Sequence, residues 1–444
     1  MELKDRKVLV VGLGKTGIET VRFLIGKGAV VRASDANPID KLPVEVKEFQ
    51  KKGVVIETDM HRTETFIWAE TIVLSPGVAF NLSQVIQAIN YGIEVISEVE
   101  LASRFLKTPI IGITGSNGKT TTCSLIARIL EQDGKRVFLG GNIGTPLIQI
   151  AESNNKFDVL VLELSSFQLQ GVKSFKPFIG VIINISPNHL DHHRSFEEYI
   201  ESKFKIFSNQ SVDDWAVYNQ DDPIVSAKVS TFKSKKIPFG MASFDNGVRY
   251  DGRYISFGTD QFDISNMKLI GSHNIENAMA AIAATRILGC NPGLIENAIV
   301  KFSPLPHRIE LVREINGVCF YNDSKSTSPG ATLRALQSFS NPIILISGGK
   351  DKGLDYSVLR DKVKEKVKHL ILLGESRFRM QNELGSIVDT SLAVSLEDAL
   401  EKASLSLRSG DTVLFSPACS SFDMYASYEE RGRNFKDIVQ KLPA

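Results

Sequence analysis

The chain lacks the features that mark disulfide-rich, membrane-spanning or nucleic-acid-binding proteins. Its 444 residues include only four cysteines, none in a Cys-x-x-Cys pair, so neither a disulfide framework nor a zinc site is predicted. No apolar run is long enough to cross a bilayer, which predicts a protein without membrane insertion. The formal net charge is only +1, so bulk charge attracts no polyanion and we expect no nucleic-acid partner.

The opening residues also lack a targeting signal. The sequence MELKDRKVLVVGLG has no uninterrupted apolar run of the signal-peptide kind and enters a strand directly, so we expect a cytoplasmic protein. What is present is ordinary for a globular protein, with 43% hydrophobic and 23% charged residues. A chain of 444 residues is too long for one core and predicts about two to four domains.

The strongest positive signal is a phosphate loop. Residues 109–122 read PIIGITGSNGKTTT, an apolar strand followed by a glycine-containing loop and the start of a helix. Such a loop turns backbone N–H groups toward phosphate oxygens, while Lys119 adds a cation and the Thr120 hydroxyl can reach a Mg²⁺ ion. A simple turn with a helix cap is the alternative, but the flanking strand and helix favour nucleotide triphosphate binding. The residues predicted to contact the nucleotide here are Gly115, Ser116, Asn117, Gly118, Lys119, Thr120 and Thr121.

A second glycine-rich turn stands near the N-terminus. The strand at residues 7–11 is followed by the turn GLGKTG at residues 12–17, a helix from Ile18 and a second strand that ends at Asp35. This order matches the Rossmann fingerprint, but it indicates NAD only weakly because the same turn binds any phosphate-bearing ligand. Further on, the strand at residues 71–74 ends in Ser75-Pro76-Gly77, another backbone-rich site at the carboxyl end of a strand.

Three stretches of alternating strands and helices follow one another, and the predicted strands of the third are VCFYNDS, PIILISGG, HLILLG and DTVLFSPA. Apolar runs such as FDVLVLE and PFIGVIINIS are typical of strands covered on both faces. A polar stretch from Asn219 to Phe262 predicts a small β excursion, and the prolines near residue 305 mark a linker. The predicted fold is α/β with three domains. They are a Rossmann-like N-terminal domain at 1–107, a central P-loop domain with a mostly parallel sheet at 108–305, and a Rossmann-like C-terminal domain at 306–444.

The central stretch holds candidate metal ligands. Glu163 follows the buried run DVLVL, so we predict that it is the acidic partner of the nucleotide's magnesium; a strand cap or an arginine pair is the alternative. His189, Asp191, His192 and His193 are close in sequence but lack the spacings of helical zinc sites. We expect His189 to lie at a metal or phosphate edge and the other two histidines to be solvated.

Several short motifs share their order with a known enzyme family. TGSNGKTT, ELSSFQL, the histidine of NISPNHLDHH, GSHNIENAMAA, PHR and NDSKST occur in the order seen in the Mur ligases, and this resemblance spans all three stretches. ELSSFQL and SPACSSFD most resemble the member that joins D-glutamate to UDP-N-acetylmuramoyl-L-alanine in bacterial peptidoglycan precursor synthesis. The resemblance implies that ATP phosphorylates the muramoyl-alanine carboxylate and that the D-glutamate amine attacks the acyl phosphate. We expect the enzyme to be cytoplasmic and monomeric.

The resemblance also implies roles for individual residues. Lys119 is expected at the γ-phosphate, Thr120 and Glu163 at one Mg²⁺ ion, and His189 and Lys203 at a second. The matching lysine of the family is carbamylated, whereas the sequence alone favours a solvent-facing Lys203 and leaves Lys205 as a weaker candidate. The other implied contacts are Asn277, Arg308 and Asp323 for ATP; Gly14, Lys15, Thr16, Asp35, Ser75, Pro76, Gly77 and Asn142 for the UDP substrate; Lys352, Ser421 and Tyr428 for D-glutamate; and Ser165 for substrate.

Other activities stay open on the residues alone. An NAD-dependent oxidoreductase explains the first glycine turn but leaves TGSNGKTT without a role. A P-loop switch or motor protein hydrolyses a nucleotide but gives the third stretch no role. Closer alternatives are a ligase for another amino acid and a folylpolyglutamate synthetase-like enzyme, which generally lacks an N-terminal UDP-binding domain.

Overall fold

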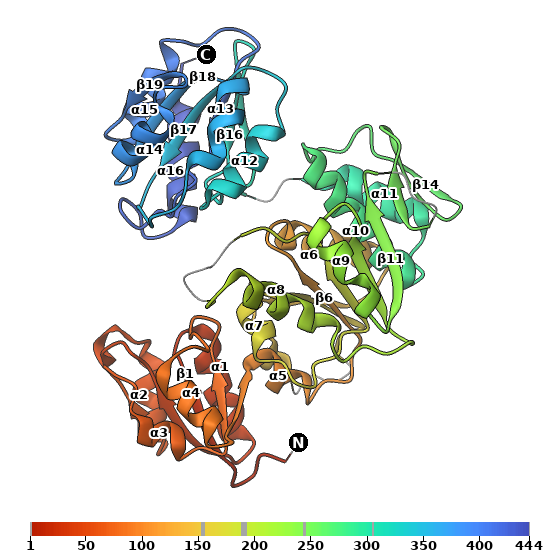
Figure 1. Ribbon diagram of the computed structural model, residues 1–444, viewed down its shortest axis with the longest axis vertical. Coiled ribbons are helices and arrows are strands. Elements are labelled where there is room, and N and C mark those ends of the chain that lie inside the picture. The colour runs from red at the N-terminus through yellow and green to blue at the C-terminus, as the bar shows by residue number, and fades with distance from the viewer. Residues whose placement is uncertain (1, 152–155, 188–192, 243–245, 304–305, 444) are drawn as a thin grey trace. The chain divides into compact units, whose positions relative to one another are not determined.

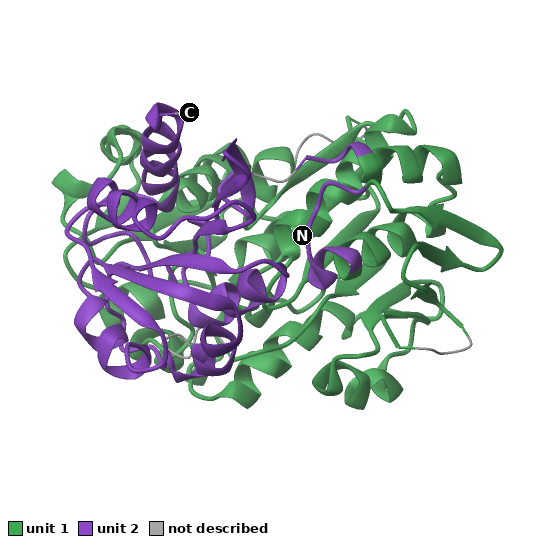
Figure 2. Ribbon diagram, turned by 90° about the horizontal axis from the view of Figure 1, so that it is seen from above, with its two compact units in different colours: residues 1–266, 276–300 green, residues 267–275, 301–444 purple. Residues whose placement is uncertain are grey.

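The computed structural model describes residues 2–443 except 152–155, 188–192, 243–245 and 304–305. Contacts divide the chain into two compact units, Met1–Asn266 with Glu276–Val300 and Met267–Ile275 with Lys301–Ala444 (Figure 2). Three sheets follow one another along the described part of the chain, two in the first unit and one in the second (Figure 1). None of the described helices is long and apolar enough to span a membrane.

The N-terminal sheet has the predicted Rossmann-like order. Its described strands are all parallel and run β3-β2-β1-β4-β5, with the buried strand β1 in the middle. Helix α1 begins at Lys15, three residues before the predicted start at Ile18, because the chain turns directly from Gly14 into the helix. The elements are β1 (Lys7–Val11), α1 (Lys15–Gly26), β2 (Val30–Ser34), α2 (Val44–Lys51), β3 (Val55–Glu57), α3 (Thr63–Ile67), β4 (Thr71–Leu74), α4 (Ser83–Asn90), β5 (Glu94–Ser97) and α5 (Glu98–Ser103).

The central sheet is mostly parallel, as predicted. Its described strands run β14-β13-β12-β11-β10-β9-β6-β8-β7, and the last hairpins from β12 to β14 are antiparallel. The predicted β excursion is confirmed in part, because the stretch after Asn219 first forms a helix, α9. The elements are β6 (Ile110–Thr114), α6 (Lys119–Gln132), β7 (Val137–Gly141), η2 (Leu147–Ile150), β8 (Val159–Glu163), α7 (Ser166–Gln170), β9 (Ile179–Ile182), α8 (Phe196–Phe204), β10 (Trp215–Asn219), α9 (Pro223–Lys228), β11 (Lys235–Gly240), β12 (Val248–Tyr250), β13 (Tyr254–Phe257), β14 (Asp260–Asp263), α10 (Ser272–Ile287) and α11 (Pro292–Lys301).

The second unit is built on a sheet in the order β15-β16-β20-β17-β18-β19. Four of its strands match the apolar runs of the sequence, whereas β15 and β19 were not predicted because they are polar and only partly buried. Strand β15 is antiparallel to β16 and the other described pairs are parallel. The elements are β15 (Glu310–Ile315), β16 (Val318–Asn322), α12 (Pro329–Gln337), β17 (Ile343–Gly348), α13 (Arg360–Lys366), β18 (Val367–Leu373), α14 (Arg377–Leu384), β19 (Asp389–Leu392), α15 (Leu396–Ser404), β20 (Thr412–Phe415) and α16 (Tyr428–Lys441).

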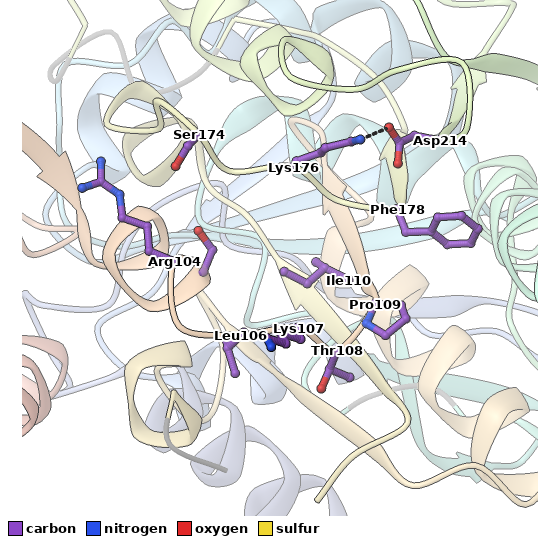
Figure 3. A pocket seen from close by; sticks show the side chains of 11 residues that line it. Arg104, Leu106, Lys107, Thr108, Pro109, Ile110, Ser174, Lys176, Phe178 and Asp214 are labelled. Carbon is purple, nitrogen blue, oxygen red and sulfur yellow. Dashed lines mark ion pairs between the residues drawn. The ribbon is translucent and has the colours of Figure 1, made fainter. Parts of the chain in front are cut away.

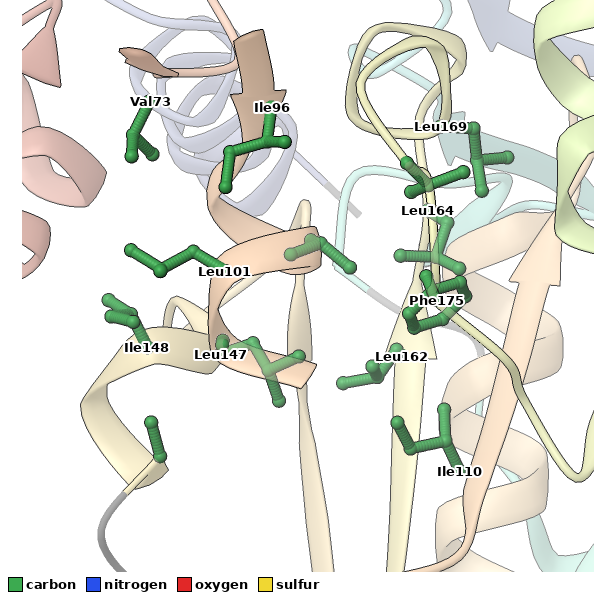
Figure 4. Packing of buried hydrophobic residues seen from close by; sticks show 14 of the residues in the cluster. Val73, Ile96, Leu101, Ile110, Leu147, Ile148, Leu162, Leu164, Leu169 and Phe175 are labelled. Carbon is green, nitrogen blue, oxygen red and sulfur yellow. The ribbon is translucent and has the colours of Figure 1, made fainter. Parts of the chain in front are cut away.

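One hydrophobic core joins the two sheets of the first unit. Leu101 of α5 and Leu147 and Ile148 of η2 are fully buried, and they belong to the same cluster as Val73 of the N-terminal sheet and Leu162 of the central sheet (Figure 4). Truncating a leucine in such a core costs about 2–5 kcal/mol, so separating the two sheets would be costly. The two sheets of this unit therefore fold around shared apolar contacts.

Candidate active site

The phosphate loop lies between β6 and α6, as predicted. Gly118 has a positive φ of 85° and precedes the first helical residue, Lys119. A Cβ atom at Gly118 would lie only 2.3 Å from Asn277 Oδ1, so both backbone conformation and space require glycine here. The same contact places Asn277 beside the loop, and the Thr122 hydroxyl donates to Asn277 Oδ1 at 3.1 Å.

The end of strand β9 supports the loop through residues that the sequence did not single out. Asn184 Oδ1 accepts from the Asn117 N–H at 2.9 Å, and its amide donates back to the Asn117 carbonyl at 3.2 Å. The Ser116 N–H donates to the Asn184 carbonyl at 2.9 Å, and the Ser116 hydroxyl lies 2.7 Å from the buried Tyr199 hydroxyl. The loop is therefore held open by its neighbours, which is the preorganisation that phosphate binding needs.

Glu163 lies beside this loop and is only 3% exposed. Its Oε2 accepts from the Thr120 hydroxyl at 2.7 Å and its Oε1 accepts from the Asn142 amide at 2.8 Å. The partners are thus a hydroxyl and an amide rather than the arginine of the alternative interpretation. Within the described residues no three His, Cys, Asp or Glu side chains cluster as a ready-made metal cage.

Two lysines converge on the carbonyl of Gly115. Lys119 Nζ donates to it at 2.8 Å and to the Ser116 carbonyl at 3.1 Å, and Lys203 Nζ donates to it at 2.8 Å. Lys203 is 2% exposed, so the interpretation of a solvent-facing helical lysine is wrong. Burial, together with the nearby charge of Lys119, holds the pKa of the Lys203 amine well below its usual value. Lys205 instead donates to the Gln170 carbonyl at 2.6 Å, away from the loop.

The histidine cluster is only partly described. His189, Asp191 and His192 lie outside the described residues, so their predicted positions stay untested. The expectation that His193 is solvated is wrong, because it is 3% exposed, with Nε2 2.9 Å from the Ser166 hydroxyl and its ring stacked on Phe167. His193 precedes α8, and a histidine before a helix can pack inward against aromatic neighbours, which sequence spacing does not reveal.

A cleft of about 670 Å³ lies at the carboxyl ends of β1, β2 and β4. Asp35 Oδ2 accepts from the Leu13 N–H at 2.7 Å, and Lys15 Nζ donates to the Gly144 carbonyl at 2.7 Å. His61 also lines the cleft, with Nδ1 2.7 Å from the Ser34 hydroxyl, and burial lowers its pKa; no sequence motif pointed to it. The cleft brings together all the residues predicted for the UDP substrate, namely Gly14, Lys15, Thr16, Asp35, Ser75, Pro76, Gly77 and Asn142.

Another cleft, of about 490 Å³, lies at the amino end of strand β6 (Figure 3). The phosphate loop follows the opposite, carboxyl end of the same strand. Arg104 and Lys107 of the segment before β6 line it, together with Lys176 and Asp214, which form an ion pair at 2.9 Å. None of the predicted site residues lines this cleft. Ser165, predicted for substrate, lies elsewhere as the N-cap of α7, where its hydroxyl accepts from the Gln168 N–H at 3.3 Å.

The second unit holds the remaining predicted residues. Asp323 is 2% exposed and accepts from the Ser416 hydroxyl at 2.8 Å, and burial raises its pKa to about 6. Tyr428 opens α16, with Lys325 Nζ 5.4 Å from its ring centroid. Ser421 is buried and Lys352 is exposed.

Arg431 is a buried residue of this unit that sequence reasoning missed. Its Nη2 donates to the carbonyls of Ser324 at 2.8 Å and of Cys419 at 3.0 Å, and its Nε donates to the Ser324 hydroxyl at 3.0 Å. It thereby ties the segment after β16 to the segment after β20. In the sequence, only the glycine that follows Arg431 could have indicated that this arginine is buried. A lone arginine in a charged helix is usually a surface residue, so Arg431 was not predicted.

Comparison with known proteins decides the family. Family models match the chain at residues 6–97 (Mur ligase MurD-like, N-terminal domain), 113–285 (Mur ligase middle domain) and 307–419 (Mur ligase, glutamate ligase domain). A UDP-N-acetylmuramoylalanine--D-glutamate ligase of Citrifermentans bemidjiense is 45% identical, with 99% of this chain and 98% of that protein covered. The chain belongs to the Mur ligase family.

Solved structures agree on the fold of this Mur ligase. A pseudomurein peptide ligase type C from Methanothermus fervidus is 21% identical with a TM-score of 0.62, and the match covers 99% of this chain and 100% of that one. A MurF ligase from Thermotoga maritima, solved in complex with ADP, is 18% identical with a TM-score of 0.63, and 99% of each chain is covered. At these identities the likeness shows the fold alone.

Family membership confirms two of the predictions. The α/β fold with consecutive domains is confirmed, and so is the activity class, an ATP-dependent acid–amino-acid ligase. Membership also sets aside the oxidoreductase and the nucleotide-switch alternatives. The individual roles of the site residues in this Mur ligase stay predictions.

Proposed function

We propose that this Mur ligase joins D-glutamate to UDP-N-acetylmuramoyl-L-alanine, a step of peptidoglycan precursor synthesis. The observation that carries this proposal is the 45% identity, over 99% of the chain, to a ligase whose printed name specifies these two substrates. The 670 Å³ cleft beside the first glycine turn supports it, because a UDP-linked substrate needs a site separate from the phosphate loop.

The proposed reaction uses ATP to activate a carboxylate. Transfer of the γ-phosphoryl group to the muramoyl-alanine carboxylate releases ADP and forms an acyl phosphate. The neutral D-glutamate amine then attacks the carbonyl carbon, the nitrogen gives up a proton, and the tetrahedral intermediate expels phosphate as the amide forms. The Lys119 ammonium, which lies over the Gly115–Gly118 loop, is suited to stabilise the charge on the transferring phosphoryl group.

The residues present fit a magnesium ion at the loop. The Thr120 hydroxyl and the Glu163 carboxylate are hard oxygen donors whose atoms lie 2.7 Å apart, so one ion can bind both. We assign these two residues to one Mg²⁺ ion, and His189 and Lys203 to a second. Bound Mg²⁺ neutralises phosphate charge. Glu163 itself is held by Asn142, which keeps its carboxylate aimed at the loop.

We also propose that Lys203 is carbamylated. Burial lowers the pKa of the Lys203 amine and so favours its neutral form, which can attack CO₂, so that a nitrogen–carbon bond forms and a proton is released. The product is a carboxylate, which suits a metal ion better than an ammonium does. Assays depleted of bicarbonate should lose activity and regain it when bicarbonate is restored. Lys205→Ala is the matched control, and activity that is indifferent to bicarbonate would count against the modification.

Other roles are assigned by family position. We propose a monomeric cytoplasmic enzyme with domains at residues 1–107, 108–305 and 306–444. The proposed ligand contacts are Gly115, Ser116, Asn117, Gly118, Thr121, Asn277, Arg308 and Asp323 for ATP; Gly14, Lys15, Thr16, Asp35, Ser75, Pro76, Gly77 and Asn142 for the UDP substrate; Lys352, Ser421 and Tyr428 for D-glutamate; and Ser165 for substrate.

Phosphate release tests the substrate assignment. The purified enzyme, ATP, Mg²⁺ and UDP-N-acetylmuramoyl-L-alanine are incubated with D-glutamate, L-glutamate, L-alanine or a diamino acid in turn. Phosphate should appear only with D-glutamate and only when the muramoyl substrate is present. Preference for any other amino acid would make the assignment wrong.

A further inference from the structure

A segment of the central sheet's domain is built into the N-terminal domain. Strand β7 ends at Gly141, and the η2 turn that follows packs against α1 and α5. Leu147 and Ile148 of this turn are buried in the core that the two sheets share (Figure 4). Residues 141–150, called the bridging segment below, therefore contact both domains of the first unit.

Two buried carboxylates of α5 hold different parts of the central domain. Glu100 accepts from the backbone N–H groups of Lys173, Ser174 and Phe175 and from Arg104 Nε. Glu98 accepts from the Ile148 N–H at 2.6 Å, so it is the carboxylate that holds the bridging segment. The Glu100 contacts adjoin the 490 Å³ cleft, which Arg104 and Ser174 line, whereas the Glu98 contact leads toward the 670 Å³ cleft and the phosphate loop.

Glu98 is an unusual anchor. It is 1% exposed, and its Oε2 has no hydrogen-bond partner within the described residues. Burial raises its pKa to about 7, while Glu100, with its many donors, has a lowered pKa. An unsatisfied buried carboxyl oxygen costs stability, so a purely structural anchor would be better served by an apolar side chain.

The bridging segment continues from this anchor to both ligand sites. Gly141 and Asn142 line the 670 Å³ cleft, and the Gly144 carbonyl accepts from Lys15 Nζ at the mouth of the first glycine turn. The Asn142 side chain donates to Glu163, and the Asn142 N–H donates to the Glu163 carbonyl at 2.9 Å. Glu163 in turn accepts from the Thr120 hydroxyl of the phosphate-loop helix.

We propose that Glu98 is a positioning residue that couples the two ligand sites. By holding the η2 turn, it fixes Asn142 both in the wall of the substrate cleft and on Glu163. This inference rests on the proposed function, since it takes the cleft as the site of the UDP-linked substrate and the loop as the site of ATP. Occupying one site then stabilises the arrangement that the other needs, and linkage makes the effect reciprocal.

Binding measurements test the coupling without turnover. Calorimetry gives the Kd of a non-hydrolysable ATP analogue with Mg²⁺, with and without UDP-N-acetylmuramoyl-L-alanine. We expect the wild-type protein to bind the analogue about fivefold or more tightly when the muramoyl substrate is present. Glu98→Ala should reduce this factor to about one and weaken muramoyl-substrate binding about tenfold, the loss of one charge-assisted hydrogen bond.

Conservative variants separate positioning from general stability. Glu98→Gln keeps an acceptor for the Ile148 N–H and should restore the coupling factor. Glu100→Gln weakens the other anchor, so it should lower the melting temperature and leave the factor unchanged. If Glu98→Ala does not fold, Glu98→Asp, one methylene shorter, takes its place and should also lose the coupling.

The outcomes are distinct. If the wild-type coupling factor survives in Glu98→Ala or Glu98→Asp, the inference is wrong. It is also wrong if Glu100→Gln loses as much of the coupling factor, because Glu98 would then contribute only to the stability of the fold. A wild-type protein that binds both ligands independently would overturn it as well. Failure of the wild-type protein to bind the muramoyl substrate at all would instead contradict the proposed function.

Discussion

Two turns of this Mur ligase have the same local design and different surroundings. Each joins a buried parallel strand to a helix, the first between β1 and α1 and the second between β6 and α6. Each is supported from a neighbouring strand end: the Ser75 hydroxyl donates to the Gly12 carbonyl at 2.7 Å, and Asn184 holds Asn117. At the level of sequence both are glycine turns with a lysine that opens a helix.

The nearby carboxylate and the lysine distinguish the turns. At the first turn Asp35 occupies the Leu13 N–H, and Lys15 reaches out to the bridging segment. At the second turn Glu163 leaves the loop N–H groups alone and holds the Thr120 hydroxyl, while Lys119 folds over its own loop. Both turns use backbone N–H groups in structural bonds, to Asp35 in the first turn and to Asn184 in the second. They differ in the lysine, which contacts a distant segment in the first turn and stays over its own loop in the second. Surroundings, not the glycine pattern, separate an anchoring turn from a turn that serves phosphoryl transfer.

Removing the lysines is the strongest test of this comparison. Lys119→Ala should lower kcat/KM by about 1,000-fold, since one preorganised charge on a transferring phosphoryl group is worth about 3–4 kcal/mol. Lys15→Ala should raise KM for the UDP substrate about fivefold and leave KM for ATP unchanged, since a single hydrogen bond of this kind is worth about 1 kcal/mol. Steady-state kinetics with each substrate varied measures both. Equal losses in the two variants would erase the distinction.

The two carboxylates should differ in kind. Glu163→Gln should cut kcat about 100-fold and shift the Mg²⁺ requirement upward, because it removes a charged metal ligand. Asp35→Asn should instead lower the free energy of unfolding by about 1–3 kcal/mol, because it weakens charge-assisted bonds to Leu13 and Asn37. Magnesium titrations and thermal unfolding of both variants provide the check. An altered Mg²⁺ requirement in Asp35→Asn would contradict this assignment.

The stability that Glu98 contributes by holding the bridging segment, which Lys15 of the first turn contacts, should depend on pH. The pKa of Glu98 is raised to about 7 in the folded protein, above its unfolded value, so its stabilising contribution is full below the unfolded pKa and is lost as pH rises through about 7. Between pH 5 and pH 8 the wild type should therefore lose about 2 kcal/mol relative to Glu98→Gln. Thermal unfolding of both proteins across this range measures the difference. Parallel pH profiles would show that Glu98 does not titrate there.

Loss of a strand-end support should have the smallest effect. Ser75→Ala removes one hydrogen bond to the Gly12 carbonyl and should cost about 1 kcal/mol of stability. It should leave the kinetics of ATP unchanged. Asn184→Ala removes the corresponding support of the phosphate loop and should raise KM for ATP several-fold. If Ser75→Ala affected ATP more than Asn184→Ala did, the two supports would not belong to separate sites.

Apolar periodicity predicted the parts of the fold that are buried on both faces. Strands β1, β6, β8, β17 and β20 read as continuous apolar runs because helices cover both of their faces. Strands β15 and β19 were not predicted because they are polar and half-buried. They are extended because they pair with neighbouring strands, not because their own residues form an apolar run. Local sequence carries no record of a partner many residues away.

The candidate site shows the same limit at the level of side chains. Lys119, Thr120 and Glu163 were predictable because the loop, the helix start and the strand end fix their places. The burial of Lys203 was not, since it depends on which face of α8 meets the phosphate loop. The burial of His193 was not either, since it depends on the packing of the segment before α8 against Ser166 and Phe167. Asn184 and Arg431 support loops from elements distant in sequence, and only the folded chain brings them there.

Because the chain has few cysteines, two buried thiols can serve as natural probes of local opening. Cys123 lies fully buried in α6 directly behind the phosphate loop, and burial raises its pKa; Cys419 is buried in the second unit. A thiol reagent can modify either one only during an opening of the structure around it, so labelling rates followed by mass spectrometry report the opening of each unit separately. The native protein thus reveals, without any engineered label, whether ATP or the amino acid protects its own unit from transient exposure.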